Sequence, residues 1–502
     1  MTLIHVDGLH LEPRDVWKVA VEGASVALAP EARERMARSH RLLHQLMDEG
    51  RPIYGVNTGF GALAQKIIPP KKEKELQKNL IRSHAAGVGK PLSREEVRAL
   101  LLLRAQALAR GYSGVRPELA EFLLAMLNAG VHPVVPSRGS LGASGDLAPL
   151  AHLALVVMGE GEAEWRGKRL PGGEALRQAG LTPMDLGPKE GLALINGTQA
   201  MTALGVLSLI RARHLVRLAD LLLALDLEAL GGNREPFLPE VQAVRGHRGQ
   251  AESAAEVLSF LEGSRLLGWA GRVQDAYSLR CGALVHGATR QALHHVEAIL
   301  TAEMRAATDN PLVFPETGRV ISAGNFHGQP LALALDYLAM AVAELGNISE
   351  RRLFRLLDPQ LSGLPPFLTR REEGLHSGLM ILQYTAASLV AENKVLCTPA
   401  SVDSIPSSAN QEDHVSMGMT AALKGAQVVE NTARILALEL VAAVQALEFH
   451  DPELWSPAAR AVREELRERI PPVEEDRSLG AEVEALAGDI LALRFPRLLL
   501  GQ

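Results

Sequence analysis

Three long apolar runs constrain the fold of this chain more than any other feature of its sequence. They extend from about Asn196 to the Gly231-Gly232 pair, from about 323 to 357, and from about Asn410 to Phe449. Each run spaces its apolar residues as a helix does and is far longer than the usual helix of about 11–12 residues. Because the heptad pattern is not strict and no solenoid repeat occurs, we expect an aligned bundle of long helices.

Two shorter helices are predicted closer to the N-terminus. Ser93 and Glu96 form a capping-box pattern before an Ala/Leu run that stops at Gly111. Pro117 opens a second apolar run that stops at Gly130, in keeping with the preference of proline for helix starts and glycine for helix ends. Both patterns predict helices that begin and end at these residues.

The remaining N-terminal sequence has a mixed character. Residues 160–190 are richer in Gly, Pro and charge than the rest of the chain, which indicates strands and loops. We therefore predict a mainly α protein with two domains. Residues 1–195 would form a mixed N-terminal region, and residues 196–502 the long-helix bundle.

Composition excludes several classes of function. The 502 residues contain 52 Lys+Arg and 58 Asp+Glu, a formal net charge of −6, so a nucleic-acid partner is not expected. The N-terminus lacks the basic and apolar regions of a signal peptide, and Asp336 and Glu344 interrupt an apolar stretch that could otherwise span a membrane. With only Cys281 and Cys397, the chain also resembles a cytoplasmic protein. We expect a small-molecule substrate and no membrane.

Motifs for common external cofactors are missing from the sequence. It contains no P-loop, no Gly-x-Gly-x-x-Gly after a strand, no His-Glu-x-x-His and no Gly-x-Ser-x-Gly. The one adjacent histidine pair, His294-His295, lies on a predicted helix where neighbouring side chains face different ways. No metal site is therefore expected.

The segment from Gly139 to Leu150 is unusually rich in small residues, and a helix is predicted to start within it. On the simpler interpretation, Ser144 or Asp146 caps that helix. A sharper chemical interpretation starts from Gly145, whose amide nitrogen could reach the carbonyl carbon of Ala143 because glycine has no Cβ. Cyclisation and dehydration of Ser144 would then give a methylidene-imidazolone, an electrophile built from the chain itself.

Several segments resemble one family of enzymes. Gly142-Ala-Ser-Gly-Asp-Leu-Ala-Pro-Leu150 is similar to the signature of the aromatic amino acid ammonia-lyases. Five further matches follow the order of that family: Tyr54-Gly-Val-Asn-Thr-Gly-Phe-Gly61, Ile195-Asn-Gly-Thr-Gln199, Gln274-Asp-Ala-Tyr-Ser-Leu-Arg280, Gly324-Asn-Phe-His-Gly328 and Ser408-Ala-Asn-Gln-Glu-Asp-His414. The resemblance spans most of the chain.

This resemblance implies a fold, a cofactor and an assembly. The fold would be the long helix bundle of the L-aspartase and fumarase type, with the smaller mixed N-terminal region carrying the electrophile loop. The cofactor would be a 4-methylidene-imidazole-5-one formed autocatalytically from Ala143, Ser144 and Gly145, without an external cofactor. Members of the family are homotetramers with active sites shared between subunits.

The resemblance also assigns roles to single residues. Tyr54 would be the base that removes the β-proton, and Tyr277 is grouped with it as catalytic. A phenol has an ordinary pKa of about 10, so such a base needs a favourable local environment. Arg280 would hold the substrate carboxylate through its planar guanidinium, with Gln274 beside it. Asn196 and Phe326 would contact the electrophile and the substrate ring, although Asn196 could also be only a helix cap.

The expected substrate depends on two further positions. His84 and Glu412 match the residues of the family's histidine-specific members, and a buried carboxylate would be left unpaired against a phenyl ring. We therefore expect conversion of L-histidine to trans-urocanate and ammonia, the first step of histidine degradation. A phenylalanine or tyrosine ammonia-lyase, an aminomutase of the same family and a catalytically silent scaffold remain as alternatives.

Three motifs fall where helices are expected to start. They lie before Leu147, at Asn196 and at Asn410 to Asp413. If these N-termini converge, their partial positive charges would draw electrons from the electrophile and stabilise nearby anions. The sequence thus predicts three helix starts directed at one site.

Overall fold

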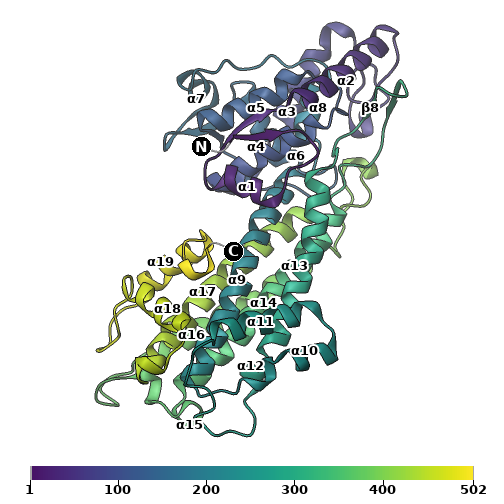
Figure 1. Ribbon diagram of the computed structural model, residues 1–502. Coiled ribbons are helices and arrows are strands. Elements are labelled where there is room, and N and C mark those ends of the chain that lie inside the picture. The colour runs from purple at the N-terminus through teal and green to yellow at the C-terminus, as the bar shows by residue number, and fades with distance from the viewer. Residues whose placement is uncertain (1–2, 501–502) are drawn as a thin grey trace. The chain divides into compact units, whose positions relative to one another are not determined.

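A computed structural model describes residues 3–500 and is mainly helical, which confirms the predicted fold class (Figure 1). The chain divides into two compact units. Unit 1 contains the residues up to Leu207, Glu297–Asp336 and Pro399–Leu423, and unit 2 contains Ser208–Val296, Tyr337–Thr398 and the residues from Lys424 on. These units are not the predicted division at residues 195 and 196, because two later segments belong to unit 1.

Unit 1 combines eight helices of its own with short strands. The helices are α1 (Pro13–Ala20), α2 (Pro30–Asp48), α3 (Glu73–His84), α4 (Arg94–Ala109), α5 (Pro117–Ala129), α6 (Leu147–Val157), α7 (Gly172–Gln178) and α8 (Glu190–Ile195). The strands are β1 (Leu3–Val6), β2 (Ser25–Leu28), β3 (Val88–Pro91), β4 (Val131–Pro133), β5 (Pro136–Arg138), β6 (Glu162–Trp165), β7 (Lys168–Pro171), β8 (Leu312–Phe314) and β9 (Arg319–Ile321). β1 and β2 pair in parallel, whereas β3–β5, β4–β6–β7 and β8–β9 are antiparallel.

The predicted capping chemistry shapes the core of unit 1. The Ser93 hydroxyl accepts the backbone N–H of Glu96, and the Glu96 carboxylate accepts that of Ser93 at 2.6 Å. Helix α4 is buried on every side from Val97 to Ala109 and packs against α1 and α5. Pro117 occupies the first turn of α5, and Gly130 ends it with a φ of +69°. Both predicted helices are confirmed.

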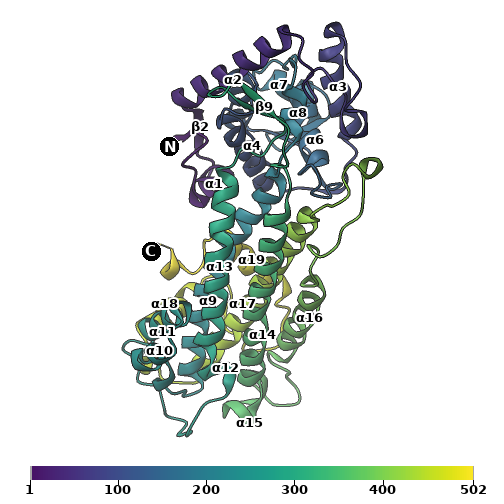
Figure 2. The ribbon, with the colours of Figure 1, turned by 90° about the vertical axis from the view of Figure 1, so that its right-hand side faces the viewer.

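Four long helices contribute residues to both units. They are α9 (Gln199–Ala229), α13 (Gly282–Met304), α14 (Gln329–Leu357) and α17 (Gly418–Leu447). Their unit 2 portions run side by side in both views (Figures 1 and 2). The other helices of unit 2 are α10 (Pro239–Arg245), α11 (Arg248–Phe260), α12 (Tyr277–Arg280), α15 (Pro359–Ser362), α16 (Met380–Leu396), α18 (Pro457–Arg467) and α19 (Gly480–Leu491). The predicted bundle of long helices is confirmed.

Two details of the sequence-based interpretation were wrong. No long helix starts within 410–413, because η5 (Ser408–Asn410) is a short 3-10 turn and α17 begins only at Gly418. Three consecutive residues of η5 have positive φ, which a helix cannot contain. Residues 160–190 hold the predicted strands β6 and β7 but also the short helix α7.

Helix α14 is both long and apolar. Among the described residues it is the one helix long and apolar enough to cross a membrane, yet 67% of its most apolar stretch is buried within the protein. Asp336 is buried and accepts the backbone N–H of Ser401 at 2.8 Å. This burial is the pattern of a core helix.

Candidate active site

The turn that contains Ala143, Ser144 and Gly145 has a backbone that only glycine can adopt at its last position. Gly145 has a φ of +73°, and a Cβ there would lie 2.1 Å from the carbonyl oxygen of Gly197. The next amide, Asp146 N–H, donates to that same oxygen at 2.6 Å. The turn is therefore pressed against the segment that precedes α9, and any side chain at position 145 would separate the two.

Asp146 secures this contact with its side chain. Its carboxylate accepts the Ser140 hydroxyl and the backbone N–H of Met201, each at 2.9 Å. Burial raises the pKa of Asp146 to about 6, although the two hydrogen bonds oppose that rise. Asp146 thus binds the first turn of α9 and not of α6, the helix that the sequence suggested it would cap.

The start of the turn is fixed by residues that precede two other long helices. The carbonyl oxygen of Gly142 accepts the Ser416 hydroxyl at 3.0 Å and the Gly328 N–H at 3.4 Å. Met417 N–H donates to the Leu141 carbonyl at 2.8 Å. Because Gly328 and Met417 immediately precede α14 and α17, the N-termini of both helices lie at the turn.

The predicted convergence of helix starts is therefore present, with one correction. The starts of α6 and α9 lie at the turn as expected. The third start belongs to α17 at Gly418 rather than to Asn410–Asp413, and α14 adds a fourth. Several N-terminal partial charges consequently face the segment that would carry the electrophile.

Glu412 contacts the same turn directly. The Ser144 hydroxyl donates to Glu412 Oε1 at 2.9 Å, and the Ser407 hydroxyl donates to Oε2 at 2.8 Å. Backbone hydrogen bonds in both directions also join Ser407 and Glu412. The intervening residues have φ values of +50° at Ser408, +52° at Ala409 and +64° at Asn410, a strained conformation that is typical of functional loops.

The Tyr54 loop lies against this strained loop. The Tyr54 hydroxyl accepts the backbone N–H of Gly61 at 3.0 Å. A Cβ on Gly61 would lie 2.5 Å from the Ser408 hydroxyl, and Gly61 has a φ of +51°. Glycine at 61 therefore allows the two loops to approach closely, which connects Tyr54 with the segment of Glu412.

Asn196 is not an N-cap, since α9 begins at Gln199 and the Asn196 amide group donates to the Asn310 carbonyl at 3.1 Å. Its own carbonyl accepts Arg104 Nη1 at 3.0 Å. The side-chain oxygen of Asn196 is buried and finds no hydrogen-bond partner among the described residues. Asn196 does cap a helix, as the C-cap residue of α8, where its backbone N–H donates to the Leu192 carbonyl at 3.0 Å. Its side-chain oxygen takes no part in that cap and is left for a group at this site.

His84 and Phe326 lie on two further elements of unit 1. His84 ends α3, where its Nδ1 contacts the Leu80 carbonyl at 2.9 Å. Phe326 lies in the turn before α14, next to His327. The His327 ring stacks on that of His414 with centroids 5.8 Å apart, and its Nε2 lies 3.2 Å from the His414 carbonyl. The Phe326 segment is thereby joined to that of Glu412.

Arg280 and Gln274, predicted to hold the substrate carboxylate, and Tyr277, predicted to be catalytic, belong to unit 2. Arg280 lies over the Tyr277 ring at 4.7 Å, and its Nε donates to the Asp275 carbonyl at 2.9 Å. Gln274 is exposed, and Tyr277 is 71% exposed. Unit 1 therefore contains Tyr54, His84, the Ala143-Ser144-Gly145 turn, Asn196, Phe326 and Glu412, while Gln274, Tyr277 and Arg280 lie in unit 2.

Sequence reasoning missed several polar residues of unit 1 that have partners within the fold. Arg104 is fully buried, and burial lowers its pKa to about 10. Lys189 and Asp309 form a buried ion pair at 2.8 Å, and Ser407 holds Glu412. Arg104 could have been found, because a lone arginine in an Ala/Leu run must face either solvent or a buried partner. Nothing in the sequence around Ser407 distinguishes it in this way from other serines.

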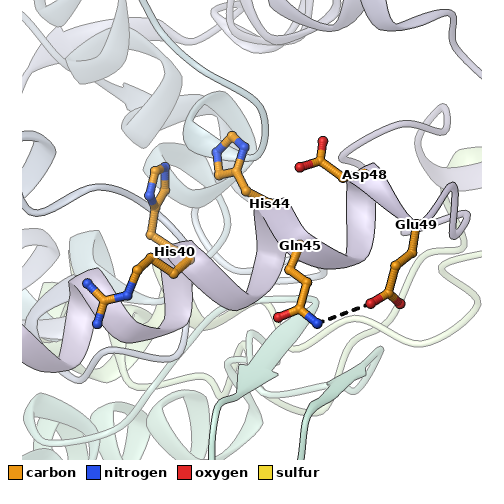
Figure 3. A pocket seen from close by; sticks show the side chains of 6 residues that line it. His40, His44, Gln45, Asp48 and Glu49 are labelled. Carbon is orange, nitrogen blue, oxygen red and sulfur yellow. Dashed lines mark hydrogen bonds between the residues drawn. The ribbon is translucent and has the colours of Figure 1, made fainter.

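Among residues 3–500, no group of three or more His, Cys, Asp or Glu is arranged to hold an ion. A hollow of about 610 Å³ on α2 is lined by His40, Arg41, His44, Gln45, Asp48 and Glu49 (Figure 3). None of the predicted site residues lines it. The candidate site is therefore the assembly around Ser144.

Known proteins share both this sequence and this fold. Residues 11–468 match the family model of aromatic amino acid lyases. A histidine ammonia-lyase of Symbiobacterium thermophilum is 58% identical over 96% of this chain and 95% of that protein. The crystal structure of histidine ammonia-lyase from Trypanosoma cruzi is 42% identical, with a TM-score of 0.91 over 99% of this chain and 96% of that one.

A second solved structure carries a different activity. Tyrosine aminomutase from Streptomyces globisporus is 39% identical, with a TM-score of 0.94 over 98% of each chain. The family match and the histidine ammonia-lyase relatives indicate a carbon–nitrogen lyase. The chain belongs to the aromatic amino acid lyase family.

Proposed function

We propose that this protein eliminates ammonia from L-histidine to give trans-urocanate, a proposal that relatives named histidine ammonia-lyase support. The observation that carries the proposal is the hydrogen bond between Ser144 and Glu412. It brings a carboxylate to the residue that would become the electrophile. An imidazole N–H of the substrate is a suitable donor to such a carboxylate.

The turn fits a 4-methylidene-imidazole-5-one formed from Ala143, Ser144 and Gly145. Gly145 lacks the side chain that would prevent close packing, and Asn196 offers a buried oxygen without a partner among the described residues. When formed, the group would supply an electrophile that turns the substrate amine into a better leaving group. The helix N-termini at the turn would support the negative charge that develops there.

Tyr54 is proposed as the base that removes the β-proton. Its hydroxyl oxygen already accepts a backbone N–H from Gly61, which would support negative charge on that oxygen after the phenol gives up its proton. The contact of its loop with Ser408 keeps Tyr54 near the segment of Glu412. His84 and Phe326 are proposed to border the substrate ring.

Arg280 and Gln274 are proposed to bind the substrate carboxylate, and Tyr277 to be catalytic, in a homotetramer with shared sites. Gln274 and Tyr277 are exposed, as expected for residues that complete a site together with another subunit. Helix α16 also exposes apolar side chains: Ile381 (57%), Tyr384 (57%) and Val395 (71%). These side chains would fit a contact between subunits. We propose a cytoplasmic enzyme without nucleic-acid or membrane partners.

Turnover of three amino acids tests the reaction. The purified protein is incubated with L-histidine, L-tyrosine and L-phenylalanine, and the conjugated acids are followed by ultraviolet absorbance. We expect histidine turnover to dominate. A phenylalanine or tyrosine ammonia-lyase, or an aminomutase, is the alternative that the tyrosine aminomutase similarity favours. Tyrosine turnover without histidine turnover would establish that alternative.

The intact mass provides the second half of the test. A chain that carries the internal electrophile weighs two waters less than its sequence. A catalytically silent scaffold keeps the full mass and turns over none of the three amino acids. The two measurements together therefore separate a change of substrate from a loss of the chemistry.

Glu412→Gln tests the assignment of the substrate ring. The amide cannot provide a charged acceptor for imidazole, and loss of a charged hydrogen bond costs about 1.5–3 kcal/mol, roughly 10- to 100-fold. We expect kcat/KM for histidine to fall by that factor relative to kcat/KM for phenylalanine. The ratio of the two is the proper readout, because it does not depend on the fraction of active chains. Equal losses on both substrates would contradict the assignment.

A further inference from the structure

We infer that Glu412 has an earlier task than substrate binding: it moves the proton that allows Ser144 to lose water when the electrophile forms. This inference rests on the proposed function, since it concerns how the proposed electrophile is made. Ser144 is the residue that must be dehydrated, and its hydroxyl donates to Glu412 Oε1 at 2.9 Å. The two residues are 268 positions apart in the chain, so the contact forms only when unit 1 has folded.

The chemistry of maturation requires such a group. The Gly145 nitrogen forms a bond to the Ala143 carbonyl carbon, and the carbonyl oxygen leaves as the first water with two hydrogens from the chain. The second water consists of the Ser144 hydroxyl and the Ser144 Cα proton. That proton must travel from Cα to Oγ while the Cα–Cβ double bond forms and the Cβ–Oγ bond breaks.

A carboxylate at Oγ can carry out this transfer. Glu412 accepts the Cα proton, becomes a carboxylic acid, and gives the proton to the leaving Oγ. It ends as the carboxylate that it was at the start, so the step needs no oxidant, reductant or second reactant. General acid–base help of this kind contributes about 10²–10⁴-fold to a rate.

Ser407 is the positioning residue for this task. Its hydroxyl donates to Glu412 Oε2 at 2.8 Å, which leaves Oε1 directed at Ser144. The backbones of Ser407 and Glu412 are also bonded to each other, across a loop whose Ser408, Ala409 and Asn410 have positive φ. A strained loop closed at both ends holds one carboxylate oxygen on the Ser144 hydroxyl.

A time course of intact mass tests the inference without any substrate. Full-length wild type, Glu412→Gln and Asp413→Asn are made by cell-free synthesis, and samples are weighed at increasing times after synthesis stops. Asp413 is the exposed neighbouring carboxylate and serves as the matched control. We expect wild type and Asp413→Asn to lose two waters at the same rate. Glu412→Gln should lose the second water about 100-fold more slowly.

The outcomes separate this inference from the proposed function. If wild type never loses water, the proposed function fails. If wild type and Glu412→Gln both lose two waters at equal rates, the electrophile forms without Glu412 and only the inference is overturned. Slow loss confined to Glu412→Gln supports it.

Variants of Ser407 keep the test decisive if Glu412→Gln does not fold. Ser407→Ala removes the hydroxyl and leaves the carboxylate, whereas Ser407→Thr keeps a hydroxyl at the same carbon. We expect Ser407→Ala to lose the second water up to about tenfold more slowly, the worth of one hydrogen bond. Ser407→Thr should restore the rate, which a purely structural role would not predict. Maturation of Ser407→Ala at the wild-type rate would overturn the inference.

Discussion

The turn at Ser144 and the helix bundle of unit 2 both bury polar side chains, but they use them differently. In the turn, buried side chains bind backbone atoms as well as one another: Asp146 accepts Met201 N–H and the Ser140 hydroxyl, and Ser416 donates to the Gly142 carbonyl. In the bundle, buried charged groups bind one another across helices. Arg352 of α14 contacts Asp226 of α9 at 3.0 Å and Glu439 of α17 at 2.5 Å.

The bundle cluster extends to a third partner helix. His286 of α13 lies 3.3 Å from Arg352 and 2.7 Å from Asp220, and all of these side chains are fully buried. Burial raises the pKa of Asp226 well above its ordinary value, with the neighbouring Glu439 adding to the rise and Arg352 opposing it. One arginine thus compensates carboxylates from two helices.

The difference follows from the state of the backbone. A long helix satisfies its own N–H and C=O groups, so buried charges between such helices have only each other as partners. An irregular turn leaves backbone groups unpaired, and polar side chains must satisfy them. We therefore expect changes in the turn to affect chemistry first and changes in the bundle cluster to affect stability first.

The largest expected effect is on activity, from Ser144→Ala in the turn. Alanine cannot lose water, so the electrophile cannot form and turnover of histidine should fall by at least about 10³-fold. The thermal midpoint should change little, because Ser144 gives up only one partly buried hydrogen bond. Activity and a melting curve on the same preparation check both expectations. Near-normal turnover would contradict the role of Ser144.

Arg352→Met tests the bundle side of the comparison. It removes the cation that compensates Asp226 and Glu439, and breaking a buried ion pair from one side costs about 3–5 kcal/mol. The matched control is Arg351→Met on the same helix, where the arginine side chain is 57% exposed. Its partner Glu350 is buried but also accepts the Gln383 amide at 2.6 Å, so we expect a smaller loss than for Arg352→Met. Urea midpoints of both variants measure the difference. Equal urea midpoints for Arg352→Met and Arg351→Met would contradict the expectation that changes in the bundle cluster affect stability first.

The sequence predicts the elements of this comparison better than their contacts. Long apolar periods predicted α9, α14 and α17 because helix periodicity is a local property of the chain. Placing the third helix start within 410–413 failed, since the positive φ values at Ser408, Ala409 and Asn410 are imposed by contacts with the Tyr54 loop and Ser144 rather than by local propensity.

The site residues, too, were predicted individually, whereas the contacts between them were not. Motif resemblance selected Ser144 and Glu412, but their hydrogen bond joins positions that no local pattern relates. Ser407 and the Lys189–Asp309 pair could not be chosen either, because single serines and charges are common on surfaces. Only tertiary structure reveals that these particular ones are buried or aimed at the turn.

A smaller effect is expected from pH, through Asp146. Below about pH 4 both the folded and the unfolded chain hold this proton. Between its ordinary pKa of 3.8 and the folded value of about 6 only the folded chain does, so stability falls as pH rises. A shift of this size corresponds to roughly 3 kcal/mol.

Asp146→Asn replaces the titrating carboxyl group with an amide that does not titrate. The stability of the variant relative to wild type should therefore rise between pH 4 and 6 and then level off. His40 and His132, whose pKa values burial lowers to about 4, change stability in the opposite direction. Their contribution is common to both proteins and cancels in the difference. Urea midpoints at several pH values provide the measurement, and parallel profiles would show that Asp146 is ionised in the folded turn.

The smallest expected effect comes from a part of unit 1 that is neither turn nor ion cluster. Ser93 caps α4 through the Glu96 N–H, and loss of an N-cap hydroxyl costs about 1 kcal/mol. Ser93→Ala should therefore lower the urea midpoint slightly, Ser93→Thr should not, and both should keep wild-type turnover per matured chain. Because α4 also carries Arg104, which binds the Asn196 carbonyl, a loss of turnover in Ser93→Ala would mean that the end of α4 and the turn are coupled. The separation of chemistry from stability would then hold only for the bundle.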